Sequence, residues 1–309
     1  MKYYIGIDVS KLKLDICILK SLDSKDFKQI KNDKKDIKDF FISFENLNDL
    51  IVVFETTSTY SYNIAKVLTD LKIKYSELNP LKVSHFLKYI SNKKNDKIDS
   101  YNLAYYSLKF ENEIVFDSFN DKSKLLRSYQ TLIELLNKIN VQIQNYDDSQ
   151  IHIYDENIKS VIDEFLDISN YNKRMLEDKA FDLVCDLLPQ TKTILANEKG
   201  IGKNLAIYLF PVFYFNQDKN YKQIISYLGL SPKVFESGSS VKKKSIIDKK
   251  GNSNIRKALF LSSLSCVRYN PKFKRYYEHL LTQNKNKKVA LVAVCNKIIR
   301  HLKNRYFRY

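Results

Sequence analysis

The spacing of the hydrophobic residues changes near residue 115, and this change limits the folds that the chain can adopt. Before it, alternating or compact apolar segments predict strands at residues 2–9, 12–20, 50–54 and 74–78. Helical patterns follow the charged segment 33–39, recur near 60–71 and begin again at Pro80. Strands that alternate with helices predict a layered α/β domain over residues 1–115.

After residue 115 the hydrophobic period becomes that of a coiled-coil helix. Seven hydrophobic residues alternate in spacings of four and three: Leu125, Tyr129, Leu132, Leu136, Ile139, Ile143 and Tyr146. A second stripe follows and can fold back on the first, and it consists of Ile158, Val161, Phe165 and Ile168. Two compatible interpretations stay open, an intramolecular helical hairpin and a dimerisation arm. We expect this helical linker to span residues 116–188, and a separate, mainly helical domain to span 189–309.

Basic residues are concentrated toward the carboxyl end of the chain. The sequence has 52 Lys+Arg and 35 Asp+Glu, a net charge of +17. Residues 241–309 hold 19 of the basic residues and two of the acids, whereas residues 1–240 hold 33 of each. An A+T-rich coding sequence raises the lysine content, but it raises it evenly along the chain. The asymmetry therefore indicates a polyanion partner, and a nucleic acid is the simplest one.

The remaining composition limits the compartment and the cofactors. The four cysteines are widely spaced and the four histidines are scattered, which argues against a zinc site or a disulfide framework. Asp8 interrupts the segment in which a signal peptide needs its apolar core, and Pro211 interrupts the longest apolar run, residues 205–215. The sequence thus predicts a cytoplasmic protein with no membrane partner.

Four acids occupy positions that favour a metal site. Asp8 lies at the end of the first predicted strand, and Glu55 directly follows the apolar run at residues 50–54. Asp96 and Asp99 are three residues apart, so they share one face of a helix. Four converging carboxylates would repel one another, and a pair of Mg²⁺ ions, or Mn²⁺ in their place, would relieve the repulsion. The alternative for Asp96 and Asp99 is an ordinary solvated helix face.

Two glycines bracket a predicted turn in the C-terminal domain. Gly200 and Gly202 separate two helical segments, and Lys203 follows them. This is the pattern of a helix-hairpin-helix, in which turn amides and a helix amino terminus hold a DNA phosphate. A plain helical turn fits the same residues.

Two sets of motifs resemble a known family. IGIDVS at residues 5–10, FET at 54–56 and NDKID at 95–99 resemble the DEDD motif of insertion-sequence transposases, whose N-terminal domain is RuvC-like and of the ribonuclease-H type. The C-terminal half is similar to the Transposase-20-type domain that completes them, through GIG at 200–202, YLGLSP at 227–232 and ESG at 236–238. The chain is thereby identified as a member of the insertion-sequence one-ten family, also described as bridge-RNA-guided recombinases. Ser58 and Asn95 depart from the residues that the family commonly has there, Gly and Thr.

The resemblance implies a mechanism, a set of site residues and a set of partners. In the family, four acids hold metal and a serine attacks the DNA phosphate to form a phosphoserine link. Carried onto this chain, the acids are Asp8, Glu55, Asp96 and Asp99, and the serine is Ser237. The implied partners are double-stranded donor and target DNA, a structured non-coding bridge RNA and further copies of the chain, as a dimer that becomes a tetramer when active. A prokaryotic, nucleoid-associated protein is implied as well.

The alternative function is a RuvC-like metal-dependent DNA nuclease or junction resolvase in which Ser237 is not catalytic. Two more serines, at positions 239 and 240, adjoin it, and spacing alone does not choose among the three. Exposed bases after the serine are expected to neutralise phosphates and to hold the DNA backbone in register. With the turn described above, the predicted nucleic-acid-binding residues are Gly200, Gly202, Lys203, Lys242, Lys243, Lys244, Lys249, Lys250, Arg256 and Lys257.

Overall fold

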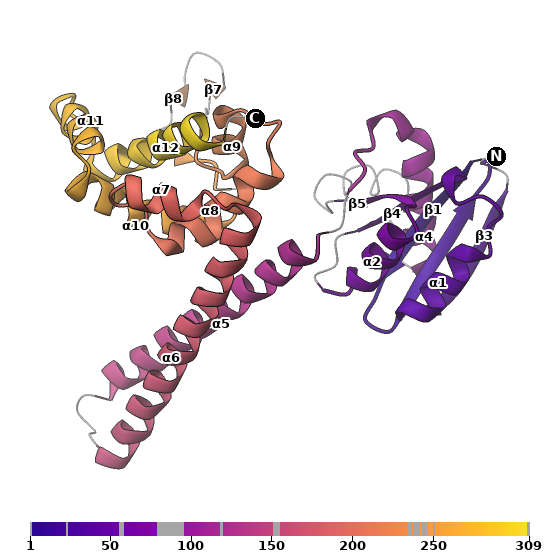
Figure 1. Ribbon diagram of the computed structural model, residues 1–309, viewed down its shortest axis with the longest axis horizontal. Coiled ribbons are helices and arrows are strands. Elements are labelled where there is room, and N and C mark those ends of the chain that lie inside the picture. Colours follow the sequence, from indigo (N-terminus) through magenta and orange to yellow (C-terminus); the bar gives the residue numbers. More distant parts are fainter. Residues whose placement is uncertain are drawn as a thin grey trace. The chain divides into compact units, whose positions relative to one another are not determined.

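The structure is a computed structural model that divides into two compact units, Met1–Asn120 and Asp121–Tyr309. Figure 1 shows the first in indigo to magenta and the second in magenta to yellow. The described residues are 2–22, 24–55, 59–78, 96–117, 120–150, 155–233, 236–237, 241–242, 246–249 and 251–307. The helix predicted from Pro80 lies outside them. In the part of the chain that the structure describes, no helix is long and apolar enough to cross a membrane.

The first unit is built on a mixed five-stranded sheet with the order β3-β2-β1-β4-β5. Strands β1 (Tyr3–Val9), β2 (Lys13–Leu19) and β3 (Lys25–Lys31) are antiparallel neighbours. Strands β4 (Leu50–Glu55) and β5 (Lys74–Leu78) continue the sheet in parallel with β1. The predicted α/β architecture and four of its strands are confirmed. The narrower assignment to a RuvC-like fold stays a prediction.

Helices cover both faces of this sheet. On one face, α1 (Lys34–Ile42) and α2 (Tyr62–Asp70) join a core with the odd-numbered residues of β1 and with Leu50, Val52 and Phe54 of β4. On the other face lies α4 (Asp96–Lys109), whose Leu103 and Ala104 pack against Val53 and Cys17. Short 3₁₀ turns at Leu47–Asp49 and Glu111–Glu113 complete the unit. The central strands are therefore buried on both sides, as the compact run at residues 50–54 predicts.

The sequence prediction lacks strand β3, and the reason is its place at the edge of the sheet. Five of its seven residues are exposed, and Phe27 and Ile30 are the half-buried ones that pack against the hydrophobic clusters. Edge strands commonly carry charged residues, which discourage pairing with other chains. The weak hydrophobic alternation that results gives little signal in the sequence.

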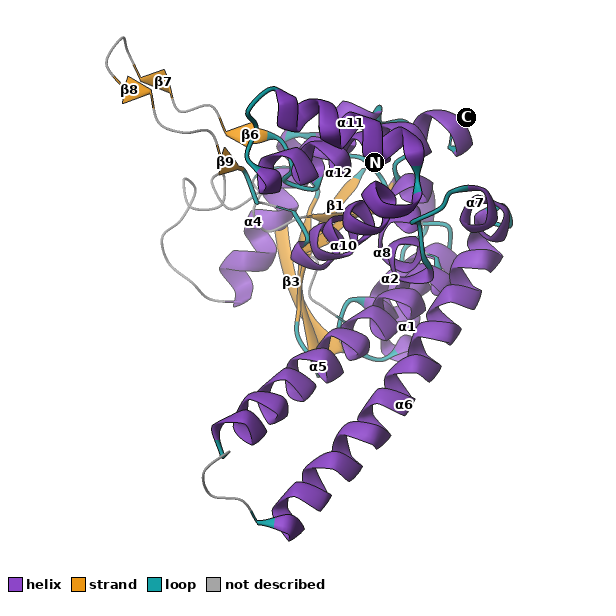
Figure 2. Cartoon of the chain, turned by 90° about the vertical axis from the view of Figure 1, so that its left-hand side faces the viewer, coloured by secondary structure: helices purple, strands orange, loops and turns teal. Residues whose placement is uncertain are grey.

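Two long helices open the second unit, α5 (Asp121–Ser149) and α6 (Glu156–Leu187). They lie side by side in Figure 1 and Figure 2 and contact each other along their length, so the predicted hairpin is confirmed. A polar layer crosses the interface, where Asn140 donates to Asn170 at 3.2 Å and accepts from Ser169 at 2.6 Å. Polar layers of this kind fix the register of paired helices.

The packing face of the hairpin differs from the prediction. On α5 the buried residues are Leu126 and Ile133, whereas the predicted seam residues Leu125, Leu132 and Tyr146 are exposed. The predicted stripe on α6, at Ile158, Val161, Phe165 and Ile168, is exposed as well. Each helix carries apolar residues on two adjacent faces, and the polar layer at Asn140 belongs to the inner one. The seam predicted on α5 is right in part, since Tyr129, Leu136, Ile139 and Ile143 are half-buried. The stripe predicted on α6 is wrong as a packing face.

The rest of the second unit is a helical cluster. It contains α7 (Thr191–Asn197), α8 (Lys203–Phe215), α9 (Tyr221–Tyr227), α10 (Ser253–Tyr269), α11 (Pro271–Thr282) and α12 (Lys287–Tyr306). Helix α8 lies at the centre, because residues 205–211 are all buried. Phe210 and Phe213 pack against Phe307, with ring centroids 5.4 and 4.7 Å apart. The mainly helical C-terminal region is as predicted.

Candidate active site

A glycine in the central strand brings α4 against the sheet. A Cβ atom at Gly6 would overlap the backbone of Ser100 and Ala104, so only glycine allows this approach. Gly6 and Asp8 are two residues apart on β1 and therefore face the same side. The contact thus brings the first turn of α4, which carries Asp96 and Asp99, to the side of the sheet that bears Asp8.

Glu55 reaches the same edge of the sheet through strand register. Strands β1 and β4 are parallel, with Gly6 opposite Val53 and Ile7 opposite Phe54. Asp8 and Glu55 are each the next residue, so both lie at the carboxyl end of a central strand, on the face that α4 covers. The four predicted acids therefore come from β1, β4 and the first turn of α4 to one region of the first unit.

The pKa of Asp8 responds to burial and to the charges around it. Burial raises the pKa of the Asp8 carboxyl, and the charges of Asp99, Asp96 and Asp15 raise it further, with Lys13 acting in the opposite sense. Like charges that share a site disfavour the ionised form of each group, because neither charge is neutralised. The charges of both acids of α4 therefore act on Asp8 from the same end of the sheet.

Asp15 is a fifth acid in this region, and the sequence reasoning missed it. It lies on β2 directly opposite Asp8, and its side chain is buried, with 7 % of the residue exposed. Gln29 Nε2 on β3 donates to Asp15 Oδ1 at 2.6 Å. The signal was present in the alternation of β2, in which Lys13, Asp15 and Cys17 point to one face. Helix α4 covers this face of β2.

Lys13 supplies a positive charge among these acids. Its Nζ lies 2.7 Å from Asp96 Oδ2 and 3.0 Å from Asp15 Oδ2, so it bridges β2 and α4. The hydrogen bonds to Asp96 and Asp15 raise the pKa of the Lys13 ammonium, and the bond from Lys13 lowers the pKa of Asp96. Lys13 therefore stabilises in part a cluster of carboxylates that would otherwise repel one another.

The donor chemistry of this cluster fits a hard divalent cation. Carboxylate oxygens are the ligands that Mg²⁺ and Mn²⁺ prefer. The pKa of Asp8 is raised first by burial and then by the neighbouring acids. Among the described side chains, no three acids, cysteines or histidines lie close enough together to hold an ion as they stand. The Lys13 ammonium instead pairs with Asp96, one of the four predicted ligands.

Ser237 lies in the second unit, in the two-residue strand β7 (Glu236–Ser237). It pairs with Val241 of β8 (Val241–Lys242) in an antiparallel ribbon, and β6 (Pro232–Lys233) pairs with β9 (Ile246–Ile247) closer to the helices. The pairing of β6 with β9 encloses that of β7 with β8 along the chain, and Ser237 belongs to the inner pair. The positions 243, 244 and 250 of the predicted basic residues lie outside the described part of the chain.

The other predicted nucleic-acid-binding residues have different surroundings. Arg256 Nη1 donates to the carbonyls of Leu228 and Gly251 at 3.1 and 2.5 Å, so it braces the segment between α9 and α10. Lys203 pairs with Asp178 at 3.0 Å. Lys257 is exposed on α10, and Lys249 has a positive φ of 59°. Lys203, Lys249 and Lys257 thus have the exposure that a phosphate contact needs, whereas Arg256 is half-buried and serves the local fold.

The two glycines of the predicted turn have unequal roles. Gly200 has φ +92°, and a Cβ atom there would come within 2.6 Å of the Cys266 backbone nitrogen on α10. Gly202 is the N-cap of α8, and a Cβ atom there would meet nothing within 4 Å. Gly200 is thus required by the packing of α10, and Gly202 leaves the amino terminus of α8 open.

Comparison with known proteins identifies the class of this chain. A family model described as "Transposase IS116/IS110/IS902 family" matches residues 192–278, and a DEDD transposase model of the IS110 type matches residues 5–146. Pilin gene-inverting proteins from Moraxella bovis and Moraxella lacunata are each 25% identical over 316 residues, which cover 96% of this chain and 94% of the relative. The protein is a DNA transposase or recombinase. More specifically, it carries IS110-family transposase domains in both halves and is distantly related to the pilin gene-inverting proteins.

Proposed function

We propose that this protein cleaves and rejoins DNA strands through a phosphoserine intermediate, with Ser237 as the nucleophile. The observation that carries the proposal is the gathering of Asp8, Asp96 and Asp99 at one end of the sheet, in a chain whose halves match the two transposase domains. Glu55 belongs to the same group by strand register. The pilin gene-inverting proteins support a reaction in which a DNA segment is recombined.

The four acids would act on the scissile phosphate. Asp8 and Glu55 lie on strands and are fixed by the sheet, whereas Asp96 and Asp99 lie on the first turn of α4. Together they would hold two Mg²⁺ ions, which, when bound, would polarise the phosphate and stabilise the leaving oxygen. Lys13 would release Asp96 when Asp96 binds a metal ion, because the ion pair with Lys13 and the bond to the metal use the same carboxylate.

The covalent bond to the serine would conserve the free energy of the cleaved phosphodiester bond. Its oxygen forms a bond to phosphorus while one phosphorus–oxygen bond of the backbone breaks, and the proton of the serine hydroxyl ends on the departing sugar oxygen. Attack by the hydroxyl of another strand then releases the serine and restores a phosphodiester. The number of phosphodiester bonds is unchanged, so strand exchange needs no ATP. A nuclease would instead consume water and leave free ends.

A covalent-trapping experiment tests the role of the serine. The full chain is incubated with labelled donor DNA and Mg²⁺, quenched with denaturant and resolved on a denaturing gel. We expect a protein–DNA adduct from the wild type, and from the neighbouring-serine variants Ser239→Ala and Ser240→Ala, but none from Ser237→Ala. If Ser237→Ala cleaves as well as the wild type and no protein forms an adduct, the protein is a metal-dependent nuclease.

A structured RNA and further copies of the chain would complete the active assembly. The basic C-terminal unit provides charge for nucleic-acid backbones but no evident code for bases, which fits selection of the DNA by pairing to a bridge RNA. Exchange of four strands requires several serines, which a symmetric oligomer supplies. The exposed stripe on α6 is a suitable surface for that assembly.

A further inference from the structure

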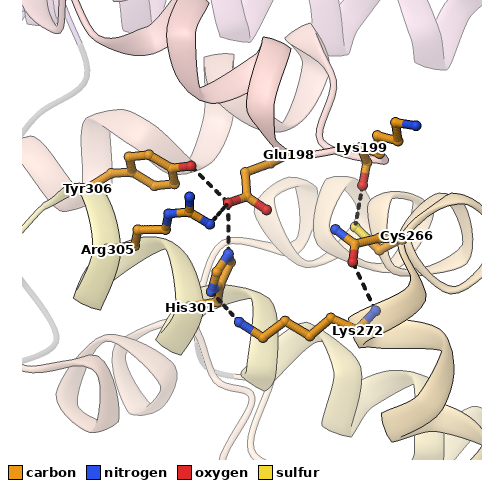
Figure 3. Close-up of polar contacts among 8 residues, drawn as sticks. Glu198, Lys199, Cys266, Lys272, His301, Arg305 and Tyr306 are labelled. Atoms are coloured by element: carbon orange, nitrogen blue, oxygen red, sulfur yellow. Dashed lines mark hydrogen bonds and ion pairs between the residues drawn. The ribbon is translucent and has the colours of Figure 1, made fainter.

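The second unit contains a buried acid that the proposed chemistry does not use. Glu198 follows α7 as its C-cap and is 3 % exposed. Its Oε1 accepts three hydrogen bonds, from His301 Nε2 at 2.8 Å, Tyr306 OH at 2.8 Å and Arg305 Nη1 at 3.1 Å, as Figure 3 shows. Buried carboxylates are costly unless such donors satisfy them. Glu198 thus anchors the last two turns of α12 to the end of α7.

The network continues from Glu198 to a surface lysine. Lys272 Nζ lies 2.8 Å from His301 Nδ1. An ammonium group has donors only, so Nδ1 must accept this bond and the ring proton is on Nε2, from which it is donated to Glu198. Phe273 packs edge-on against the imidazole, with ring centroids 5.8 Å apart. The orientation of His301 is therefore fixed from three sides, and it in turn holds the head of Lys272 in place (Figure 3).

These residues border a basic pocket of about 380 Å³. Its lining comes from α11 and α12 and consists of Lys272, Lys297, Arg300, His301, Asn304 and Arg305. Two of the bases also rest on aromatic rings: Lys297 Nζ lies 4.9 Å from the centre of Tyr276, and the Arg300 guanidinium lies 5.3 Å from that of Tyr221. Four permanent cations thus surround one hollow, and contacts beneath them restrict their freedom.

We propose that this pocket binds a phosphate of a nucleic-acid backbone. Lys and Arg donors at the rim match the charge of a phosphodiester, and Asn304 offers a neutral amide beside them. Glu198 offsets one of these charges through its ion pair with Arg305, and Lys272, Lys297 and Arg300 remain without an acidic partner in that network. Bases held at fixed spacing lose less side-chain freedom on binding than free surface lysines. The pocket is on α11 and α12, outside the segment 232–247 that carries Ser237, so it would position the nucleic acid rather than take part in cleavage.

The proposal rests on the proposed function only in requiring a nucleic-acid substrate, and the test is designed to separate the two. All proteins carry Ser237→Ala, so that binding is measured without cleavage. The pocket variant is Lys297→Gln with Arg300→Gln. The control is Arg174→Gln with Lys179→Gln, which removes the same two charges from exposed positions on α6. Fluorescence anisotropy with labelled duplex DNA and with a labelled RNA hairpin is recorded over a series of salt concentrations.

We expect the pocket variant to bind at least one of the two nucleic acids about tenfold more weakly than the control. The slope of log affinity against log salt should also fall, by about 0.9 for each duplex phosphate that the variant no longer neutralises. The arm that responds identifies DNA or RNA as the source of the phosphate. A third variant, Asn304→Asp, introduces a negative charge while leaving every cation in place, and should weaken the same arm. Equal affinities and slopes for pocket and control variants on both nucleic acids would overturn the proposal, whatever the trapping experiment gives.

Discussion

At the scale of single residues, charge balance governs the carboxylate cluster of the first unit. Asp8 lies among Asp15, Asp96 and Asp99, and Lys13 offsets part of their charge through Asp15 and Asp96. A cluster of this kind is costly in the metal-free protein, because each carboxylate loses hydration and gains like-charged neighbours. Sites that bind charged ligands often carry such a cost before the ligand arrives.

The raised pKa of Asp8 predicts how the stability of a variant at this position depends on pH. The pKa of Asp8 is raised in the folded protein, so the folded state binds more protons than the unfolded state between the ordinary value of 3.8 and the raised one. Stability therefore falls as the pH rises through that window. Asp8→Asn removes the ionisation, and we expect it to raise the melting temperature at pH 7 in EDTA by about 1–3 °C. The difference should shrink toward pH 4.

Differential scanning fluorimetry at both pH values, with and without Mg²⁺, measures this effect. Asp26→Asn on the edge strand β3 removes an exposed acid and serves as the control. A melting temperature of Asp8→Asn at or below that of the wild type at pH 7 would mean that Asp8 is not under repulsion.

At the scale of secondary-structure elements, the two glycines of the turn between α7 and α8 have different roles. Gly200 is needed for packing, whereas Gly202 leaves the amino terminus of α8 open to a ligand. Gly200 has φ +92° and touches the backbone of Cys266, so Gly200→Ala would strain the turn and push α10 away. We expect Gly200→Ala to lower the free energy of unfolding by about 2–4 kcal/mol. Gly202→Ala, for which the space is open, should change it by less than about 1 kcal/mol.

Urea unfolding followed by circular dichroism compares the two variants. If they lose equal stability, the close approach of Gly200 to α10 is not what selects glycine there. A normal fold for Gly202→Ala also allows its DNA affinity to be measured separately, which tests the helix-hairpin-helix interpretation of the open α8 amino terminus.

The elements that could be predicted from the sequence are those whose hydrophobic pattern fits one type of secondary structure. The apolar run from Leu50 to Phe54 is typical of a strand covered on both sides, and Glu55 lies half-buried at its carboxyl end. Strand β3 has no such pattern because it lies at the sheet edge. Asp15 was missed because its burial depends on α4, which is about 80 residues away in the chain. Long-range packing of this kind is not encoded in local periodicity.

At the scale of the whole molecule, the exposed stripe of α6 points to assembly. Ile158, Val161, Phe165 and Ile168 keep heptad-like spacing on the exposed side of the helix, which is the pattern of a coiled-coil seam. We expect Phe165→Glu to shift the protein to a smaller oligomer. Burying the charge of the new glutamate in an apolar interface would cost more free energy than the interface contact of Phe165 contributes. Light scattering coupled to size-exclusion chromatography measures the mass. Ser160→Glu, an exposed position off the stripe, should leave the mass unchanged.

The division into two units has a consequence for how the active site is completed. The acids belong to the unit Met1–Asn120 and Ser237 to the unit Asp121–Tyr309. If Ser237 acts with the acids, as we propose, they could come from one chain or from two. If the serine of one subunit completes the carboxylate site of another, two inactive variants should complement each other. Asp8→Asn keeps an intact serine, and Ser237→Ala keeps intact acids. In a mixed dimer, one site then contains both wild-type halves.

We therefore expect a mixture of these two variants, denatured and refolded together, to form the DNA adduct at up to about a quarter of the wild-type yield, because half of the dimers are mixed and each mixed dimer has one working site of two. The adduct should be on the Asp8→Asn chain, which a size tag identifies on the gel. Each variant alone should form none. An assembly that uses the acids and the serine of the same chain predicts no adduct from the mixture, since no chain in it carries both groups.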